Sequence, residues 1–158
     1  MQPLALPYIG NTDLLQLTKV GFLAPSHISS RSILPTMKWA TEMACRDDVA
    51  VVGGFSSRME EEVLRLLLQG RCGIILLLAR QLYKSLPEVW QQPLEDNRLL
   101  VISTCRQTRQ NRQAAFERNM KVCELADQVV MPTAPPKESS LYAIYEQQSR
   151  ANHLTTLL

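Results

Sequence analysis

Apolar and polar positions form alternating blocks along the chain, and the blocks show two different spacings. Short, nearly continuous apolar runs occur at 19–24, 49–52, 73–79, 98–103 and 128–131. Runs of this length and composition are typical of strands covered on both faces of a parallel sheet. The stretches between them carry apolar residues at the three- and four-residue spacing of amphipathic helices. The pattern therefore predicts strands and helices in alternation.

The predicted helices cover about 32–44, 59–69, 87–95, 112–126 and 140–151. Strands that alternate with helices need right-handed crossovers. The sequence therefore predicts an α/β domain, a Rossmann-like doubly wound, mainly parallel sheet of five or six strands with helices on both faces. Residues 1–17 are expected to form an extended lead-in with one helical turn near Asp13, and Gly70 to end the second helix as a C′ glycine. We expect a single domain over residues 1–158.

The turn after the 49–52 run is the place where a ligand fits best. Gly53 and Gly54 lack a Cβ atom, so a ligand can approach the main chain closely there. Phe55 and Ser56 complete the turn, and Ser57 has the capping-box spacing to Glu60 at the start of the next helix. A helix N-terminus behind a glycine turn favours anions. The alternative is a tight turn whose glycines only allow helix and strand to pack.

Other side chains follow the ends of the predicted strands. Ligands of doubly wound sheets bind beyond the carboxyl ends of the strands, near the point where strand order reverses. Ser26, Arg80 and Ser103 follow three of those ends. Arg80 ends a strongly apolar strand, where a cation is better explained by an anionic ligand than by sheet stability. We therefore expect a phosphate to meet the main-chain N–H groups of 54–57 with arginine nearby.

Composition and charge exclude several classes of protein. The 158 residues are 46% hydrophobic and 20% charged with a net charge of +2, which is typical of a globular protein and too small a charge to indicate nucleic acid. The longest apolar run, 74–79, is too short to span a membrane. Four cysteines without CxxC spacing predict buried, reduced thiols in a cytoplasmic protein. His27 and His153 alone cannot build a metal site or a triad, and we expect no cofactor.

The positive charge is concentrated in one segment. Five basic residues and one acidic residue lie within sixteen positions, namely Arg106, Arg109, Arg112, Arg118, Lys121 and Glu117. Guanidinium groups there could hold phosphates at the rim of the crevice. The alternative for Arg109 and Arg112 is a solvated helix face.

Several segments, taken in order, resemble the DNA-processing protein A (DprA/Smf) family, within the superfamily that includes the LOG phosphoribohydrolases. The lead-in Gly10-Asn11 with Leu14-Leu15 is similar to the approach to that family's first strand. The segment 52–57 stands where the family has a Ser-Gly-Gly-Ala turn, and 98–103 is similar to its fourth strand. Residues 117–119 and 125–130 match its "RN…LAD.vvV" segment.

The resemblance implies a DNA-processing protein that binds a nucleotide or single-stranded DNA, with Arg118 and Asn119 in the site. Two alternatives stay open: an enzyme that hydrolyses a nucleotide N-glycosidic bond with Glu60 as its carboxylate, and a structural or partner-binding module. A homo-oligomer is compatible with each of these functions. Ala24-Pro25-Ser26 replaces the family's Gly-Ser/Thr-Arg, and the LOG signature Pro-Gly-Gly-x-Gly-Thr is absent. Binding of a nucleotide or single-stranded DNA is therefore the leading hypothesis, and no catalytic residue is assigned.

Overall fold

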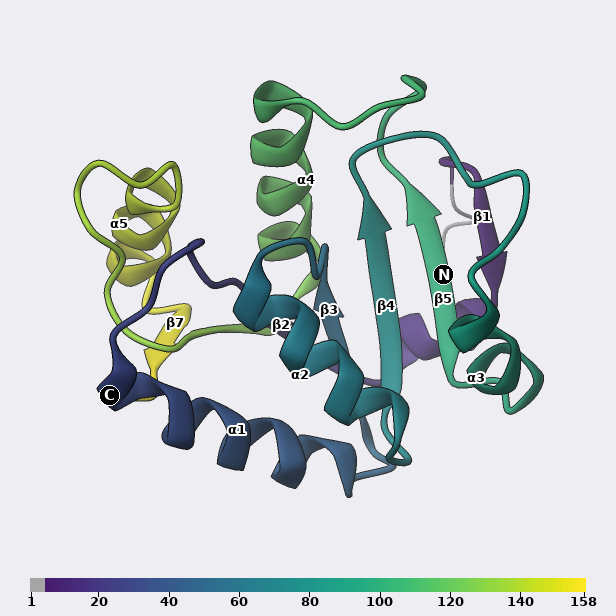
Figure 1. The fold of residues 1–158 in the computed structure, drawn as a ribbon, viewed down its shortest axis with the longest axis horizontal. Helices are drawn as coiled ribbons and strands as arrows, with labels where there is room; N and C mark the ends of the chain where they lie inside the picture. The colour runs from purple at the N-terminus through teal and green to yellow at the C-terminus, as the bar shows by residue number, and fades with distance from the viewer. Residues whose placement is uncertain (1–4) are drawn as a thin grey trace.

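A computed structural model describes residues 5–158, which are built around one seven-stranded sheet (Figure 1). The strand order is β1-β5-β4-β3-β2-β6-β7. The strands are β1 (Tyr8–Gly10), β2 (Thr18–Phe22), β3 (Val49–Gly53), β4 (Gly73–Leu78), β5 (Leu99–Ser103), β6 (Gln128–Met131) and β7 (Leu154–Thr156). β1 pairs antiparallel with β5, and the other neighbours are parallel. The first four residues of the predicted lead-in lie outside the described residues.

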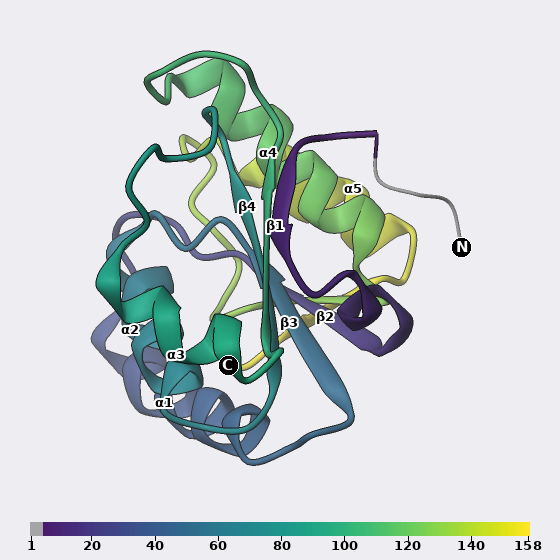
Figure 2. The same ribbon diagram turned by 90° about the vertical axis from the view of Figure 1, so that its right-hand side faces the viewer.

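Helices cover both faces of the sheet, as predicted. Figure 2 shows the sheet nearly edge-on, with α1 (Ser30–Ala44), α2 (Arg58–Leu68) and α3 (Gln91–Glu95) on one side and α4 (Arg112–Leu125) and α5 (Tyr142–Arg150) on the other. Two short 3-10 turns, η1 (Thr12–Gln16) and η2 (Glu88–Trp90), complete the described elements. The architecture is thus the doubly wound α/β class that the apolar pattern indicates.

The sheet has a separate hydrophobic core on each face, and the central strand β3 contributes to both. Val49 and Val51 pack toward α1 and α2, whereas Ala50 and Val52 pack toward α4, and all four are fully buried. Side chains of successive strand residues point to opposite faces. A strand with apolar residues on both faces must therefore be covered on both sides, which explains its continuous apolar run.

Two details differ from the sequence-based expectation. The sheet has seven strands because β1 and β7 are three-residue edge strands, too short to produce a recognisable apolar period. Gly70 does not take the left-handed conformation of a C′ glycine. Its space is restricted instead, since a Cβ atom there would lie 2.3 Å from the carbonyl oxygen of Ala44.

The cysteines were expected to be buried, and only two of them are. Cys72 and Cys123 are buried, Cys105 is half-buried and Cys45 is exposed, and all four are free thiols. Burial raises the pKa of the Cys72 thiol to about 11 and that of Cys123 to about 12. No helix in the described part of the chain is both long and apolar enough to cross a membrane.

The strand order reverses beside β2. From β2 the chain adds β3, β4 and β5 on one side, and α4 then packs across β2, β3 and β4 to deliver β6 on the other side of β2. Loops that follow β2 and β6 therefore diverge at this point, which leaves a crevice beyond the carboxyl ends of the strands. The N-terminal halves of α2 and α4 both lie there.

Candidate functional site

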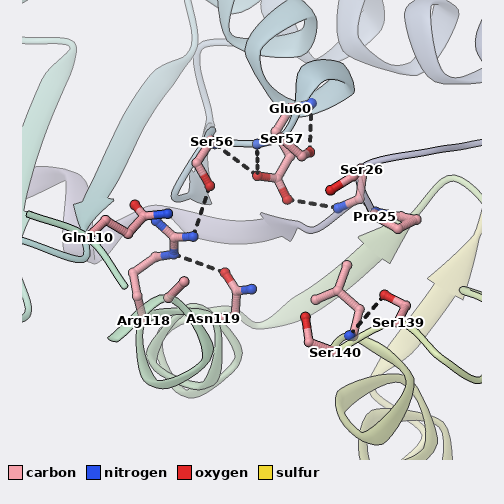
Figure 3. A pocket seen from close by; sticks show the side chains of 13 residues that line it. Pro25, Ser26, Ser56, Ser57, Glu60, Gln110, Arg118, Asn119, Ser139 and Ser140 are labelled. Atoms are coloured by element: carbon pink, nitrogen blue, oxygen red, sulfur yellow. Dashed lines mark hydrogen bonds between the residues drawn. The ribbon is translucent and has the colours of Figure 1, made fainter. Parts of the chain in front are cut away.

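A pocket of about 260 Å³ occupies the point where strand order reverses (Figure 3). Arg118 and Asn119 reach into it from α4, with Ser56 and Glu60 above them at the start of α2. The loops after β2 and before α5 form the opposite wall, through Ser26 and Ser140 among others. Segments from four parts of the chain therefore meet in one small polar cavity.

Glu60 is a structural tie between two of these segments. The residue is only 3% exposed. Oε2 accepts from the main-chain N–H of Ala24 at 2.9 Å, and Oε1 accepts from the N–H groups of Ser56 at 3.0 Å and Ser57 at 3.1 Å. The Glu60 N–H in turn donates to Ser57 Oγ at 3.4 Å, which completes the predicted capping box. The loops after β2 and β3 are thus joined through one side chain.

This arrangement corrects the expected mode of phosphate binding. The N–H groups of Ser56 and Ser57, predicted to meet a phosphate, already donate to Glu60. The carboxylate occupies the position at the helix N-terminus that an anionic ligand would take. An anion in this pocket must therefore be held by side chains.

Arg118 is the cation available for that role. Its side chain is 2% exposed, yet it forms no ion pair within 4.0 Å among residues 5–158. Nε donates to Asn119 Oδ1 at 2.9 Å and Nη2 donates to Ser56 Oγ at 3.0 Å. Nη1 has no hydrogen-bond partner in the described part of the chain. Every fully buried side-chain nitrogen in that part has a hydrogen-bond partner, so Nη1 is not fully buried and remains open to the pocket.

The electrostatic environment of Arg118 is unusual for a buried cation. Burial lowers its pKa, and the negative charge of Glu60 partly opposes this by raising it. Arginine still stays protonated in proteins. Buried cations are normally paired with a carboxylate or another anion. Arg118 lacks such a partner within the described residues, so an anionic ligand at Nη1 would complete its surroundings.

The glycine turn supports this arginine. Gly54 was expected to leave space for a ligand, and this expectation is wrong. Its φ is not positive, and the guanidinium of Arg118 fills the space beside it.

Phe55, which is buried, is the turn residue with a left-handed backbone at φ 51°. Its ring packs against Gly53, where an added Cβ atom would lie 3.2 Å from Phe55 Cζ. Non-glycine residues in this conformation are strained by about 1–2 kcal/mol, and such strain concentrates at functional sites.

The other predicted residues fall into two groups. Ser26, Ser56, Ser57, Arg118 and Asn119 line the pocket together, whereas Gly53, Gly54, Phe55, Arg80 and Ser103 do not. Arg80 instead lies 4.0 Å above the ring of Tyr83 and donates from Nε to the Gln81 carbonyl. Ser103 Oγ lies within hydrogen-bond distance of two carbonyl oxygens, 2.7 Å from that of Arg80 and 2.8 Å from that of Cys105, and its single hydroxyl hydrogen can be donated to either. The binding roles of all ten residues stay predictions.

Sequence reasoning missed part of the pocket wall. Gln110 enters from the loop before α4, and Ser139 and Ser140 enter from the loop before α5. Ser139 Oγ accepts from the Leu141 N–H at 3.1 Å, a local contact at the start of the last helix. Small polar residues before a helix suggest a cap, so the only signal in the sequence indicated a structural role.

A second cavity of about 330 Å³ continues from the pocket along α4. It shares Ala115, Asn119 and Ser140 with the pocket, and it adds Arg112, the exposed Glu138 and the half-buried Phe116. The exposed Arg106 and Arg109 are not among the residues that line either cavity. No group of three or more His, Cys, Asp or Glu residues that could hold a metal ion occurs within residues 5–158.

The fold is similar to that of two solved structures of DNA processing protein A. DNA processing protein A from Helicobacter pylori, whose structure was described for its unique mode of binding single-stranded DNA, superposes with a TM-score of 0.71 at 23% identity, covering 93% of this chain and 68% of that chain. DNA processing protein A (DprA) from Streptococcus pneumoniae superposes with a TM-score of 0.69 at 17% identity, covering 93% of this chain and 52% of that chain. This chain thus spans about half of the S. pneumoniae protein. No protein-family model and no curated protein sequence matches the chain.

Proposed function

We propose that this protein binds single-stranded nucleic acid, with a backbone phosphate held by Arg118 in the pocket beyond β2, β3 and β6. The observation that carries the proposal is the state of Arg118, a buried guanidinium with no carboxylate in contact among the described residues and with Nη1 open to the pocket. Charge-assisted hydrogen bonds from guanidinium to phosphate are among the stronger contacts in proteins.

The other groups in the pocket suit the same ligand. A phosphodiester carries one negative charge, which one guanidinium neutralises. The hydroxyl groups of Ser26 and Ser140 and the amide of Asn119 supply further donors around Arg118. Phe116 in the adjoining cavity offers an aromatic surface for a base. The similar fold of the H. pylori protein, described as binding single-stranded DNA, supports this choice of ligand.

The hydrolytic alternative receives less support. A catalytic carboxylate needs a free oxygen directed at the substrate or at a water. Both oxygens of Glu60 already accept main-chain N–H groups, three in total. These contacts explain Glu60 as a residue that positions two loops, and no other carboxylate among residues 5–158 lines the pocket.

The proposal is tested by fluorescence anisotropy at low salt with a labelled oligo-dT, followed by competition with nucleoside monophosphates. Arg118→Met should weaken binding by about 2 kcal/mol or more, which is about thirtyfold. Arg46→Ala is the matched control, because Arg46 is an exposed arginine paired with Asp48 just before β3, at the opposite end of the strands. The proposal is wrong if the wild-type protein binds neither ligand, or if both variants bind equally well.

A further inference from the structure

A third cavity, of about 310 Å³, lies on the other side of Ser26 from the Arg118 pocket, between the start of α1 and the start of α2. Ser26 lines both cavities, so they are neighbours. Ile28, Ile33 and Met59 give this cavity an apolar surface, and His27, Arg58 and Glu62 add polar groups to it. It therefore combines an apolar wall with a basic side chain, and the carboxylate of Glu62 is already paired with Arg65 at 2.9 Å.

Arg58 is not explained by the fold. It is exposed and is the first residue of α2, after the N-cap Ser57. A cation at this end of a helix is unfavourable, because the helix dipole is positive there. In the described part of the chain Arg58 forms no ion pair or hydrogen bond, whereas Arg65 in the same helix pairs with Glu62 at 2.9 Å. An anion beside Arg58 would remove the mismatch.

His27 is in the same situation, with no partner for either ring nitrogen among residues 5–158. A nucleotide unit has the chemistry that such a cavity accepts. Its base can stack or pack on apolar side chains, and its phosphate can contact a guanidinium. Imidazole nitrogens can bond a base edge or a phosphate.

The Arg118 pocket adjoins both other cavities through shared residues, Ser26 on one side and Ala115, Asn119 and Ser140 on the other. Arg112, Arg118 and Arg58 each line one of them, and none of the three has a carboxylate within 4.0 Å in the part of the chain that the structure describes. Shared residues connect each cavity to the next. Each cavity is also lined by one carboxylate, Glu60, Glu62 or Glu138, and none of these forms an ion pair with the arginine of its cavity. Three neighbouring arginines without a carboxylate in contact match a ligand with several phosphates in sequence.

We propose that the cavity beside His27 and Arg58 is a second nucleotide subsite, filled by the unit next to the one held by Arg118. The inference rests on the proposed function and makes it more specific. The ligand is a polymer of at least two nucleotides that crosses Ser26, and a mononucleotide uses only the Arg118 pocket.

The test compares Arg58→Ala, Arg118→Met and the control Arg46→Ala with thymidine monophosphate and with an oligo-dT of about ten nucleotides. Arg58→Ala should weaken oligonucleotide binding about two- to fivefold at low salt. It should also make the slope of log affinity against log salt shallower by about 0.7, the value of one phosphate contact on a single strand. Mononucleotide binding should not change. The melting temperature should stay the same or rise, because an unfavourable charge leaves the helix N-terminus.

Each other outcome separates the two proposals. An unchanged oligonucleotide affinity in Arg58→Ala, together with its loss in Arg118→Met, removes the second subsite and leaves the proposed function. Equal weakening of mononucleotide and oligonucleotide would place Arg58 on the first phosphate and overturn the subsite. Absence of binding by the wild-type protein removes both proposals.

Discussion

A Cβ atom on Gly54 would lie 2.2 Å from Cζ of Arg118, 2.3 Å from Nη1 and 2.4 Å from Nε. These three nearly equal distances mean that the guanidinium faces the main chain of Gly54. The position requires glycine because no side chain fits between the turn and the arginine. The backbone angles of Gly54 are ones that other residues can also adopt. Gly54 therefore acts on the pocket through Arg118.

The first prediction concerns this contact. Gly54→Ala should displace the guanidinium and reduce oligonucleotide binding nearly as much as Arg118→Met does. Alanine can adopt the backbone angles at this position, so the protein should still fold, with a free energy of unfolding lower by about 1–3 kcal/mol from overpacking. Anisotropy and chemical denaturation on the same preparations measure both effects.

The control is the double variant Gly54→Ala with Arg118→Met. If Gly54 acts only through Arg118, adding Gly54→Ala to Arg118→Met should change binding no further and should destabilise less than it does alone. Additive losses in binding would show that Gly54 contacts the ligand itself.

The second prediction separates a functional arginine from a structural one. Burial lowers the pKa of Arg118, so the folded state disfavours its charge. Arg118→Met should therefore leave the free energy of unfolding unchanged or raise it by up to about 1 kcal/mol. Its former partners Ser56 and Asn119 line the pocket, where water can reach them.

Arg98→Met is the matched comparison. Arg98 donates to the carbonyl groups of Leu67, Leu68 and Cys72, and so holds the C-terminal end of α2. Its loss should lower stability by about 1–3 kcal/mol and leave binding per folded molecule intact. The reverse pattern, with Arg118→Met the less stable variant and its binding retained, would mark Arg118 as structural.

The third prediction concerns Glu60. In Glu60→Gln an amide NH₂ group replaces one of the two carboxylate oxygens and cannot accept from the main-chain N–H groups that this oxygen served. The free energy of unfolding should therefore fall by about 1–3 kcal/mol. Glu61→Gln, at an exposed neighbouring position, should have little effect. Nucleoside monophosphates incubated with wild-type protein should release no free base. Base release that Glu60→Gln abolishes would instead support the hydrolytic alternative.

The fourth prediction follows from the buried thiols. Burial raises the pKa of Cys72 from 9.0 to about 11 and that of Cys123 from 9.0 to about 12, so the protonated thiol is the form that the folded protein favours. This stabilisation is fully present below pH 9, where unfolded thiols are protonated too, and it is lost as pH rises from 9 toward 12.

A thiol reagent at neutral pH should accordingly modify Cys45 quickly and leave Cys72 and Cys123 unmodified until the protein is unfolded. Cys45→Ser should remove the fast phase. Rapid modification of either buried thiol under native conditions would contradict the packing described for both cores.

Local patterns explain what the sequence revealed. The apolar run of β3 and the Ser57–Glu60 spacing lie within a few residues, and both predict the structure around them. The Arg118–Ser56 contact joins residues 62 positions apart. It depends on where α4 crosses the sheet, which no local pattern determines. The basic segment 106–121 indicated the region, and the resemblance to a known family singled out Arg118 within it.

Arg80 shows the reverse case. It ends an apolar strand, and such a position indicates a ligand if the strand lies at the crevice. The strand order places β4 two positions away from β2, outside the reversal point. A nearby aromatic ring and main-chain carbonyl then satisfy the arginine. Strand order is set by long-range packing, so the sequence alone could not separate Arg80 from Arg118.

The central claim is that Arg118 holds a phosphate of single-stranded nucleic acid, and side-chain NMR tests it most directly. The Nε–Hε signal of Arg118, assigned by its absence in Arg118→Met, is followed as unlabelled oligo-dT is added to ¹⁵N-labelled protein. We predict a saturable shift of this signal with the same affinity that anisotropy gives, while the signal of Arg46 stays fixed. Oligonucleotide binding that shifts the exposed Arg106 and Arg109 and leaves Arg118 unchanged would contradict the account.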